Sequence, residues 1–275
     1  MLRRYALPAW LRGRPGRSDE AFYVACTAHG AHVLEPGLVL LRGAVCTAEQ
    51  RSLAAACWAA GCGRANPEHS FFSADGALNG PKARRGRVFD ACEHFTGGLG
   101  ARLMAGCDGW VREARATDAA MPQHTPTHLL MLYYRSGGTL GFHRDEQAND
   151  GTGDEPVVSL TLGASADLAL RHEHTDPARV LTLHSGDVLL FGGPCRRMLH
   201  AVAATHGVAD GVLPEAAGAG ARLSLTLRHA PEVCGHEHLY RTFRPETDDV
   251  RRAPTGDERL LGEEEARRRL RRMVE

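Results

Sequence analysis

Short segments rich in β-forming residues recur along this chain, and they limit its possible folds more than any other feature. They lie at residues 37–42, 131–134, 156–162, 166–170, 180–183, 188–191 and 222–228. Branched and aromatic residues favour strands, and the Gly, Asp and Ser residues between these segments favour turns. Many short antiparallel strands are typical of two packed sheets. The sequence therefore predicts a mainly β protein, a double-stranded β-helix (a cupin-like jelly roll), whose mouth commonly holds a metal.

Two helices and one tight turn complete this predicted fold. Thr47 and Gln50 match a capping box that would open a helix over residues 47–61. A second helix is predicted at residues 101–114, and both would buttress the outer face of one sheet. Residues 185–187 (Ser-Gly-Asp) predict a tight hairpin between the strands on either side.

Two histidines and an aspartate indicate a metal site. Two imidazoles and one carboxylate are the ligand set that holds non-heme Fe(II) and leaves positions open for O2 and a cosubstrate. His143 and Asp145 are two residues apart, so on an extended strand they would face the same metal, while His200 would come from another strand. A histidine on a strand is more often a surface or core residue than a ligand, but the strand context favours a metal-binding triad of these three residues.

Two arginines indicate a site for a dicarboxylate. Arg222 and Arg228 are six residues apart in a strictly alternating segment, so they face the same side of one strand. A guanidinium can grip a carboxylate through two hydrogen bonds. Iron together with a dicarboxylate such as 2-oxoglutarate would make a coherent oxidising site.

These motifs, in this order and spacing, resemble those of the AlkB family of Fe(II)/2-oxoglutarate dioxygenases, which act on alkylated nucleobases. Tyr134 stands nine residues before His143, and the sequence SGDVLLFGG precedes His200. The resemblance covers about residues 37–230 and is strongest over residues 132–200. The chain is most similar to the branch that carries Asn-Tyr-Tyr ahead of the metal motif.

The resemblance implies a set of roles. The triad would bind Fe(II), Arg222 and the Tyr134 hydroxyl would hold the distal carboxylate of 2-oxoglutarate, and Arg228 would lie near the carboxylate next to the keto group. The implied reaction is oxidative demethylation of N-alkylated bases in DNA or RNA, using O2 and releasing succinate, CO2 and formaldehyde. A base in a duplex would have to be flipped out, or the substrate would be single-stranded.

Three positions depart from the family pattern. Leu132 replaces an Asn that helps to hold the cosubstrate, and Ser224, a shorter donor expected at the same site, replaces a second Asn. Gln147 stands where founding members carry an acidic residue that reads the base. The first two changes bear on cosubstrate binding and the third on which base is recognised.

Residues 62–92 correspond to a lid over the nucleotide in the resembling family. Phe71 and Phe72 could stack on bases. Basic residues that could contact phosphates follow at Lys82, Arg84, Arg85 and Arg87. A solvated run of charge on a loop is an equal alternative for this cluster.

The predicted organisation is a basic N-terminal arm at residues 1–34, disordered or targeting, a dioxygenase domain at residues 35–245, and a charged C-terminal tail or helix at residues 246–275. The formal net charge is zero, so nucleic-acid binding must depend on local patches. Eight Cys residues without a CxxC motif are typical of reduced thiols. We expect an intracellular monomer without a membrane span, cytoplasmic or nuclear, with mitochondrial or plastid import as an alternative.

Two further groups have metal-binding residue types. Cys234, His236 and His238 lack the wider spacing and second pair of a structural zinc site, so an exposed polar loop is expected there. His172 and His174 are expected to line a surface. Two other classes of function stay open: the same chemistry on a protein or small molecule, and a binding module without turnover.

Overall fold

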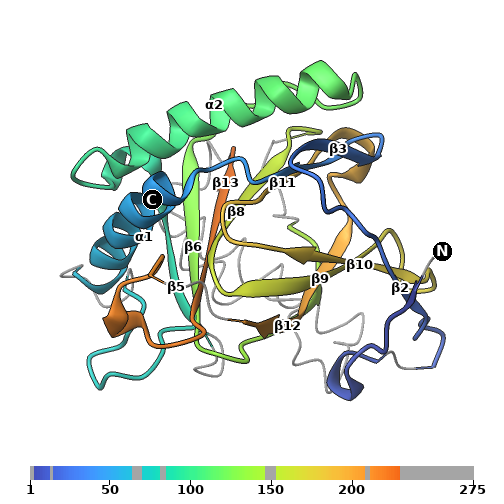
Figure 1. Ribbon diagram of the computed structural model, residues 1–275, viewed down its shortest axis with the longest axis horizontal. Coiled ribbons are helices and arrows are strands. Elements are labelled where there is room, and N and C mark those ends of the chain that lie inside the picture. The colour runs from blue at the N-terminus through green and yellow to red at the C-terminus, as the bar shows by residue number, and fades with distance from the viewer. Residues whose placement is uncertain are drawn as a thin grey trace, which may run out of the picture.

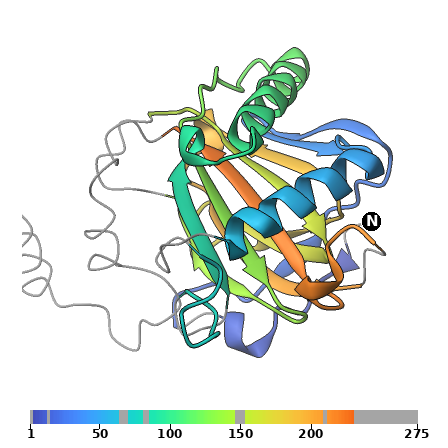
Figure 2. The same ribbon diagram turned by 90° about the vertical axis from the view of Figure 1, so that its left-hand side faces the viewer.

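The computed structural model describes residues 3–12, 15–63, 70–80, 85–145, 153–207 and 211–229. Two sheets pack face to face, and helices α1 (Thr47–Cys62) and α2 (Leu99–Thr117) cover the outer face of one of them (Figures 1 and 2). The predicted mainly β fold of the jelly-roll type, with helices on one sheet, is confirmed.

The strands divide into a seven-stranded and a six-stranded sheet. The seven-stranded sheet has the order β3 (Gly30–Glu35), β4 (Leu38–Arg42), β11 (Val188–Phe191), β8 (Val157–Gly163), β13 (Arg222–Arg228), β6 (His128–Tyr134) and β5 (Gly86–Ala91). The six-stranded sheet has the order β1 (Arg3–Arg4), β2 (Ala21–Tyr23), β10 (Ala178–Leu183), β9 (Ser165–Arg171), β12 (Leu199–His206) and β7 (Leu140–His143). Neighbouring strands are antiparallel except β2 and β10. Short 3-10 helices lie at η1 (Ala9–Leu11), η4 (Cys92–His94), η5 (Gly193–Cys195) and η6 (Glu215–Ala217).

Apolar and polar residues alternate along β13, so the strand has one apolar face and one polar face. Leu223, Leu225 and Leu227 pack in the cluster that joins this sheet to the helices. Because side chains alternate across a strand, the polar residues of β13 point the other way, into the space between the sheets. All seven residues of the strand are buried, so this inner polar face must find partners inside the protein.

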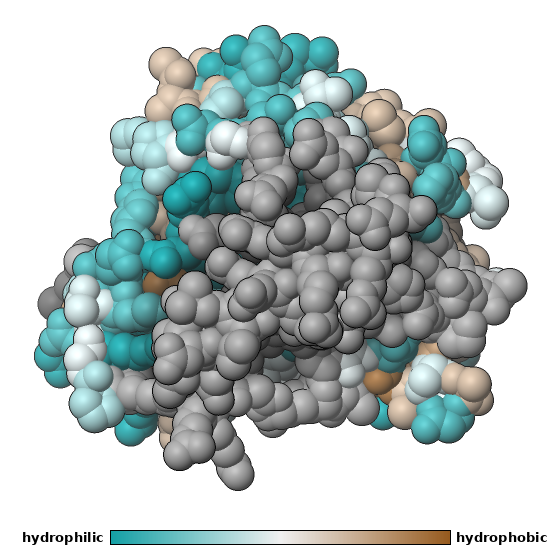
Figure 3. Space-filling model, turned by 180° about the vertical axis from the view of Figure 1, so that it is seen from behind, coloured by the Kyte–Doolittle hydropathy of each residue, from teal (hydrophilic) through white to brown (hydrophobic). Residues whose placement is uncertain are grey.

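Helix α2 presents an apolar stripe to the seven-stranded sheet. Its buried residues recur every three or four positions, at Leu99, Leu103, Cys107, Val111 and Ala114. In the space-filling view the top of the molecule, where α2 lies, is mostly hydrophilic (Figure 3). The helix therefore covers the outer core with its apolar face and exposes its charged face to solvent.

The capping box predicted at Thr47 is wrong. Cys46 is the N-cap residue, and no side chain caps the helix. The Gln50 side chain instead donates to the Val45 carbonyl (2.7 Å) and accepts from the Ser185 hydroxyl (2.6 Å). Gln50 is buried, so its amide is used for tertiary contacts and does not cap the helix.

The hairpin predicted at residues 185–187 is also wrong. The strands on either side, β10 and β11, belong to different sheets, so the turn carries the chain from one sheet to the other. Asp187 is 1% exposed, forms an ion pair with Arg42 and accepts from the backbone N–H of Gly43 (2.8 Å) and His184 (2.6 Å). A turn signal in the sequence does not reveal which neighbours the flanking strands will find.

The described residues of the expected N-terminal arm belong to the fold. Tyr5 and Tyr23 donate to the same carboxylate oxygen of Asp167 (3.3 and 3.2 Å). Leu7 and Leu11 are buried against the six-stranded sheet. Targeting by this segment stays a prediction, and the tail predicted at residues 246–275 lies outside the described residues. Among the described helices, none is both long and apolar enough to span a membrane.

Candidate active site

The triad residues meet at one point between the sheets. His143 and His200 are cross-strand partners on β7 and β12, with ring centroids 4.1 Å apart. Asp145 lies just past the end of β7 and not on the strand, as the spacing argument had assumed. Its Oδ1 lies 3.8 Å from His143 Nε2 and its Oδ2 lies 3.9 Å from His200 Nε2. One ligand atom from each residue lies within 4.8 Å of the others, so the three could hold a metal ion together.

Backbone carbonyls orient both imidazoles. His143 Nδ1 lies 2.9 Å from the Gly141 carbonyl, and His200 Nδ1 lies 3.1 Å from the Met198 carbonyl. Because a carbonyl can only accept, each Nδ1 must carry a proton, so Nε2 is the ring nitrogen that could bind a metal. An outer hydrogen bond of this kind fixes the tautomer of a metal-binding histidine.

The ionisation states also fit a divalent cation. Burial, together with His200, lowers the pKa of His143 to about 3, so this ring is neutral at neutral pH. Burial alone would raise the pKa of Asp145. The nearby groups Arg228, His200, His143 and Arg196 lower it by more, so the pKa of Asp145 lies well below its usual range. Neutral imidazoles and an ionised carboxylate are the forms that bind metals.

Two arginines that sequence reasoning missed hold the segment carrying Asp145. Arg196 Nη1 donates to the Asp145 carbonyl (2.9 Å). Arg144 donates to the carbonyls of Arg197 (2.8 Å) and His172 (2.9 Å). No motif marks such roles, because they depend on which backbone carbonyl each guanidinium meets in the folded chain.

Among the described residues, Arg222 is the largest side chain that is almost completely buried. Its Nη2 donates to the Thr161 hydroxyl (3.0 Å) and approaches the Ser224 hydroxyl (3.4 Å). Its Nε and Nη1 have no hydrogen-bond partner among the described residues. Burial raises the pKa of the neighbouring Tyr134 hydroxyl, although the positive charges of Arg222 and Arg85 partly offset this rise. Unpaired donors on a buried cation are costly, so this end of the pocket fits an anionic group.

Arg228 lies at the metal end of the same strand. Its Nη1 is 4.0 Å from Asp145 Oδ1, and its guanidinium carbon is 5.4 Å from the centroid of the Phe89 ring. Its buried Nε also lacks a partner within the described part of the chain. One strand therefore carries two buried guanidiniums, each with at least one nitrogen that lacks a partner among the described residues, and this pair suits a molecule with two carboxylates.

The hydroxyl-bearing face of β8 contributes to this pocket. Ser159 Oγ lies 3.5 Å from Ser224 Oγ, and Thr161 contacts Arg222. Sequence reasoning missed both residues, although the alternation in residues 156–162 places them on one face. Leu132, which pairs with Ser224 across β6 and β13, packs in the apolar cluster between the sheets.

The expected lid divides into parts with different surroundings. Phe71 and Phe72 pack against Tyr133, with ring centroids 5.6 and 5.8 Å apart, in the outer core under α1, so they do not reach the pocket where they were expected to stack on bases. Arg85 is buried, and its positive charge acts on Tyr134 and His143. Arg85 is therefore not part of a solvated charge run.

Of the other basic residues, Arg87 lies on β5 with its guanidinium 5.8 Å from the Phe89 ring centroid. Its partner across the sheet is Leu132, whose side chain faces the space between the sheets. Lys82, Arg84 and Gln147 lie outside the described residues, as do Cys234, His236 and His238.

Comparisons with known proteins agree with this site. The family model for the 2OG-Fe(II) oxygenase superfamily matches residues 96–228, which include the triad and both pocket arginines. A DNA N(6)-methyladenine demethylase, ALKBH1C of Arabidopsis thaliana, is 27% identical over 230 residues, 74% of this chain and 50% of the relative. An alpha-ketoglutarate-dependent dioxygenase AlkB homolog of Caulobacter vibrioides is 35% identical over 113 residues, 40% of this chain and 47% of the relative.

A solved structure shares the fold. The structure of OsALKBH1 matches with a TM-score of 0.56 and 23% sequence identity, over 73% of this chain and all of that one. This chain spans about half the length of the two curated relatives above. Iron and 2-oxoglutarate are the cofactor and cosubstrate of this superfamily, and the donor set fits both. Over residues 96–228 the chain is similar to the 2OG-Fe(II) oxygenase superfamily, and the relatives that it matches include AlkB-type dioxygenases.

Proposed function

We propose that this protein removes N-methyl groups from nucleobases in single-stranded or locally opened DNA or RNA. One observation supports this most strongly: two histidines and an aspartate that could hold a metal lie between the sheets, together with two buried arginines that keep some donors without partners among the described residues. The names of the relatives, one a DNA N(6)-methyladenine demethylase, support nucleic acid as the substrate. We further propose that it acts as a monomer that uses O2.

In this proposal His143, Asp145 and His200 hold Fe(II), and the other positions on the metal stay open for cosubstrate and O2. The chemistry that Fe(II) supplies when bound is activation of O2, coupled to oxidative decarboxylation of 2-oxoglutarate to succinate and CO2. The protein's contribution is to present two imidazoles and one carboxylate in fixed orientations. No side chain has to act as a general base.

Arg222 would hold the distal carboxylate of 2-oxoglutarate with help from the Tyr134 hydroxyl, and Arg228 would lie near the carboxylate next to the keto group. Ser224 would support Arg222 through its hydroxyl, 3.4 Å from Nη2. The free Nε and Nη1 of Arg222 could each donate a hydrogen bond to an anionic ligand. This arrangement would orient the cosubstrate. The arginines would also replace the water molecules that hydrate its two carboxylates in solution.

Substrate contacts are proposed for Lys82, Arg84, Arg85, Arg87 and Gln147. Arg85 is the best placed among the described residues, because it is buried and its charge reaches both Tyr134 and His143. Arg85 would act at the mouth of the pocket, where a flipped base would enter. Neutralising Lys82, Arg84 and Arg87 together should weaken oligonucleotide binding and flatten its salt dependence, since fewer counterions would be released.

The deciding experiment is mass spectrometry of nucleosides after the protein is incubated with Fe(II), 2-oxoglutarate and a panel of methylated DNA and RNA oligonucleotides. We expect loss of one or more methylated bases, with formaldehyde and succinate formed in equal amounts, and no loss with Asp145→Ala. Succinate formation without any demethylated base would reject nucleic acid as the substrate and favour a protein or small molecule. No succinate at all would favour a binding module without turnover.

A further inference from the structure

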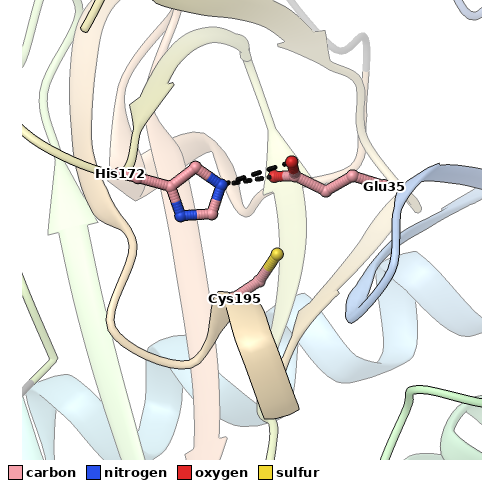
Figure 4. Close-up of side chains that lie close together, drawn as sticks. All are labelled: Glu35, His172 and Cys195. Carbon is pink, nitrogen blue, oxygen red and sulfur yellow. Dashed lines mark hydrogen bonds and ion pairs between the residues drawn. The ribbon is translucent and has the colours of Figure 1, made fainter.

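A second group of metal-ligating side chains lies outside the triad. Glu35 ends β3, His172 directly follows β9, and Cys195 ends η5. A ring nitrogen, a carboxylate oxygen and the sulfur lie within 4.8 Å of one another. The His172 Nε2 is 3.2 Å from both Glu35 oxygens, and the imidazole and the thiol both point toward the carboxylate (Figure 4).

Close backbone contacts build this corner. Gly37 adopts a φ of +86°, and a Cβ on it would lie 2.3 Å from the Gly192 carbonyl oxygen, so the turn after β3 sits directly on η5. The Gly192 N–H donates to the Gly37 carbonyl (2.8 Å), and the Cys195 thiol donates to the Pro36 carbonyl (3.2 Å). These two segments are thus already held together before any ligand binds, as a preformed metal site requires, and His172 joins them through its contact with Glu35.

Arg179 supports the carboxylate from behind. It forms an ion pair with Oε1 of Glu35, while His172 Nε2 lies equally close to both oxygens. Hydrogen bonds to the outer oxygen of a ligating carboxylate are a normal feature of metal sites, because they fix its orientation. Glu35 is ionised, since hydrogen bonds from Arg179 and His172 lower its pKa although burial opposes this.

We propose that Glu35, His172 and Cys195 form a second metal site that takes Zn²⁺ or a cation of similar softness. Cysteine sulfur, histidine nitrogen and a carboxylate oxygen are the three ligand types that zinc uses in proteins. The thiolate distinguishes this site from the triad, which offers only nitrogen and oxygen and suits Fe(II). The proposal does not depend on the function proposed above.

Metal binding here exchanges a proton for a bond. The buried thiol keeps its proton at neutral pH, because burial and the nearby Glu35 raise the pKa of Cys195 to about 12. Binding therefore replaces the S–H bond by a sulfur–metal bond and releases one proton to solvent. The proton that His172 directs at Glu35 moves from Nε2 to Nδ1 through water, and no oxidation state changes. The ion can enter past His172, whose side chain is 46% exposed. Water would fill the fourth position.

An ion at this site would tie together segments that also hold the triad. The His172 carbonyl accepts from Arg144, next to His143, and the residue after Cys195 is Arg196, which donates to the Asp145 carbonyl. Occupancy would therefore brace the segment that carries the metal motif. We expect Zn²⁺ to raise the melting temperature of the full chain.

The test is a titration of the metal-free full chain with Co²⁺, followed by the sulfur-to-cobalt charge-transfer band in the near ultraviolet. Only a thiolate site gives this band, so Co²⁺ bound at the triad does not contribute. We expect the band to saturate within two equivalents, because the triad also takes up Co²⁺, and to disappear when Zn²⁺ is added. The band should be absent in Cys195→Ser and should need about tenfold more Co²⁺ in Glu35→Gln and His172→Gln. Asp145→Ala should keep it.

The matched control is Cys234→Ser, because Cys234 lies beside His236 and His238 and could supply a thiolate of its own. The band should persist in this variant. A band that is lost in Cys234→Ser and kept in Cys195→Ser would overturn the proposal, as would no band at all in the wild type. If Cys195→Ser does not fold, the two Gln variants decide: unchanged Co²⁺ affinity in both would reject the site.

Discussion

Arg222 should act as a destabilising residue until its ligand binds. The guanidinium is 1% exposed, and two of its three nitrogens lack partners among the described residues. Each unsatisfied buried donor costs about 1–3 kcal/mol, whereas the bond to Thr161 returns about 1.5–3 kcal/mol. Arg222→Met removes both contributions and fills similar space. We therefore expect the free energy of unfolding without cosubstrate to rise by about 2 kcal/mol.

The assay is thermal unfolding with and without Mn²⁺ and 2-oxoglutarate. A gain of this size corresponds to a melting temperature about 4–8 °C higher for Arg222→Met in the absence of ligand. The wild type should gain about 2.7 kcal/mol at a cosubstrate concentration of about 100 Kd, and the variant should gain almost nothing. Arg102→Met, at an exposed arginine paired with Glu49 at 2.7 Å, is the control and should change stability by less than about 0.5 kcal/mol.

Two results would refute this reasoning. A lower melting temperature for Arg222→Met without ligand would show that the buried guanidinium stabilises the fold by itself. An equal shift with 2-oxoglutarate in wild type and variant would show that Arg222 does not hold the cosubstrate.

Three further predictions concern the triad, the turn between the sheets and the thiols. Asp145→Ala should abolish succinate formation while circular dichroism shows an intact fold, and a wild-type rate would reject the metal assignment. Gly186→Ala should lower the free energy of unfolding in urea by about 2 kcal/mol or more, because φ is +86° and the new Cβ would lie 2.2 Å from Gln50 Nε2; an unchanged midpoint would contradict this. Burial raises the pKa of Cys57 to about 12, so at pH 8 only about one thiol in 10⁴ is ionised there. At pH 8, peptide mapping should therefore find iodoacetamide on exposed Cys46 and not on Cys57. The labelling rate of Cys57 should rise about tenfold per pH unit while the fold persists. Equal labelling of the two thiols at pH 8 would reject the burial argument.

Local residue patterns were enough to predict most of the strands and the position of the pocket. The alternation in residues 222–228 places both arginines on one inner face, because side-chain direction along a strand has a period of two whatever the strand pairs with. The order of Tyr134, His143, Asp145 and His200 indicated the family for the same reason: each motif is short and carries its own geometry.

Pairing and burial were decided only by the tertiary structure. The sequence Ser185-Gly186-Asp187 signals a turn, but whether its flanking strands pair with each other depends on distant partners, and here they join different sheets. Phe71 looked like a stacking residue and became core because α1 and Tyr133 cover it. Glu35, His172 and Cys195 are far apart in the chain, so no sequence motif predicts that they lie together. The sheets bring them together through contacts that no local pattern encodes.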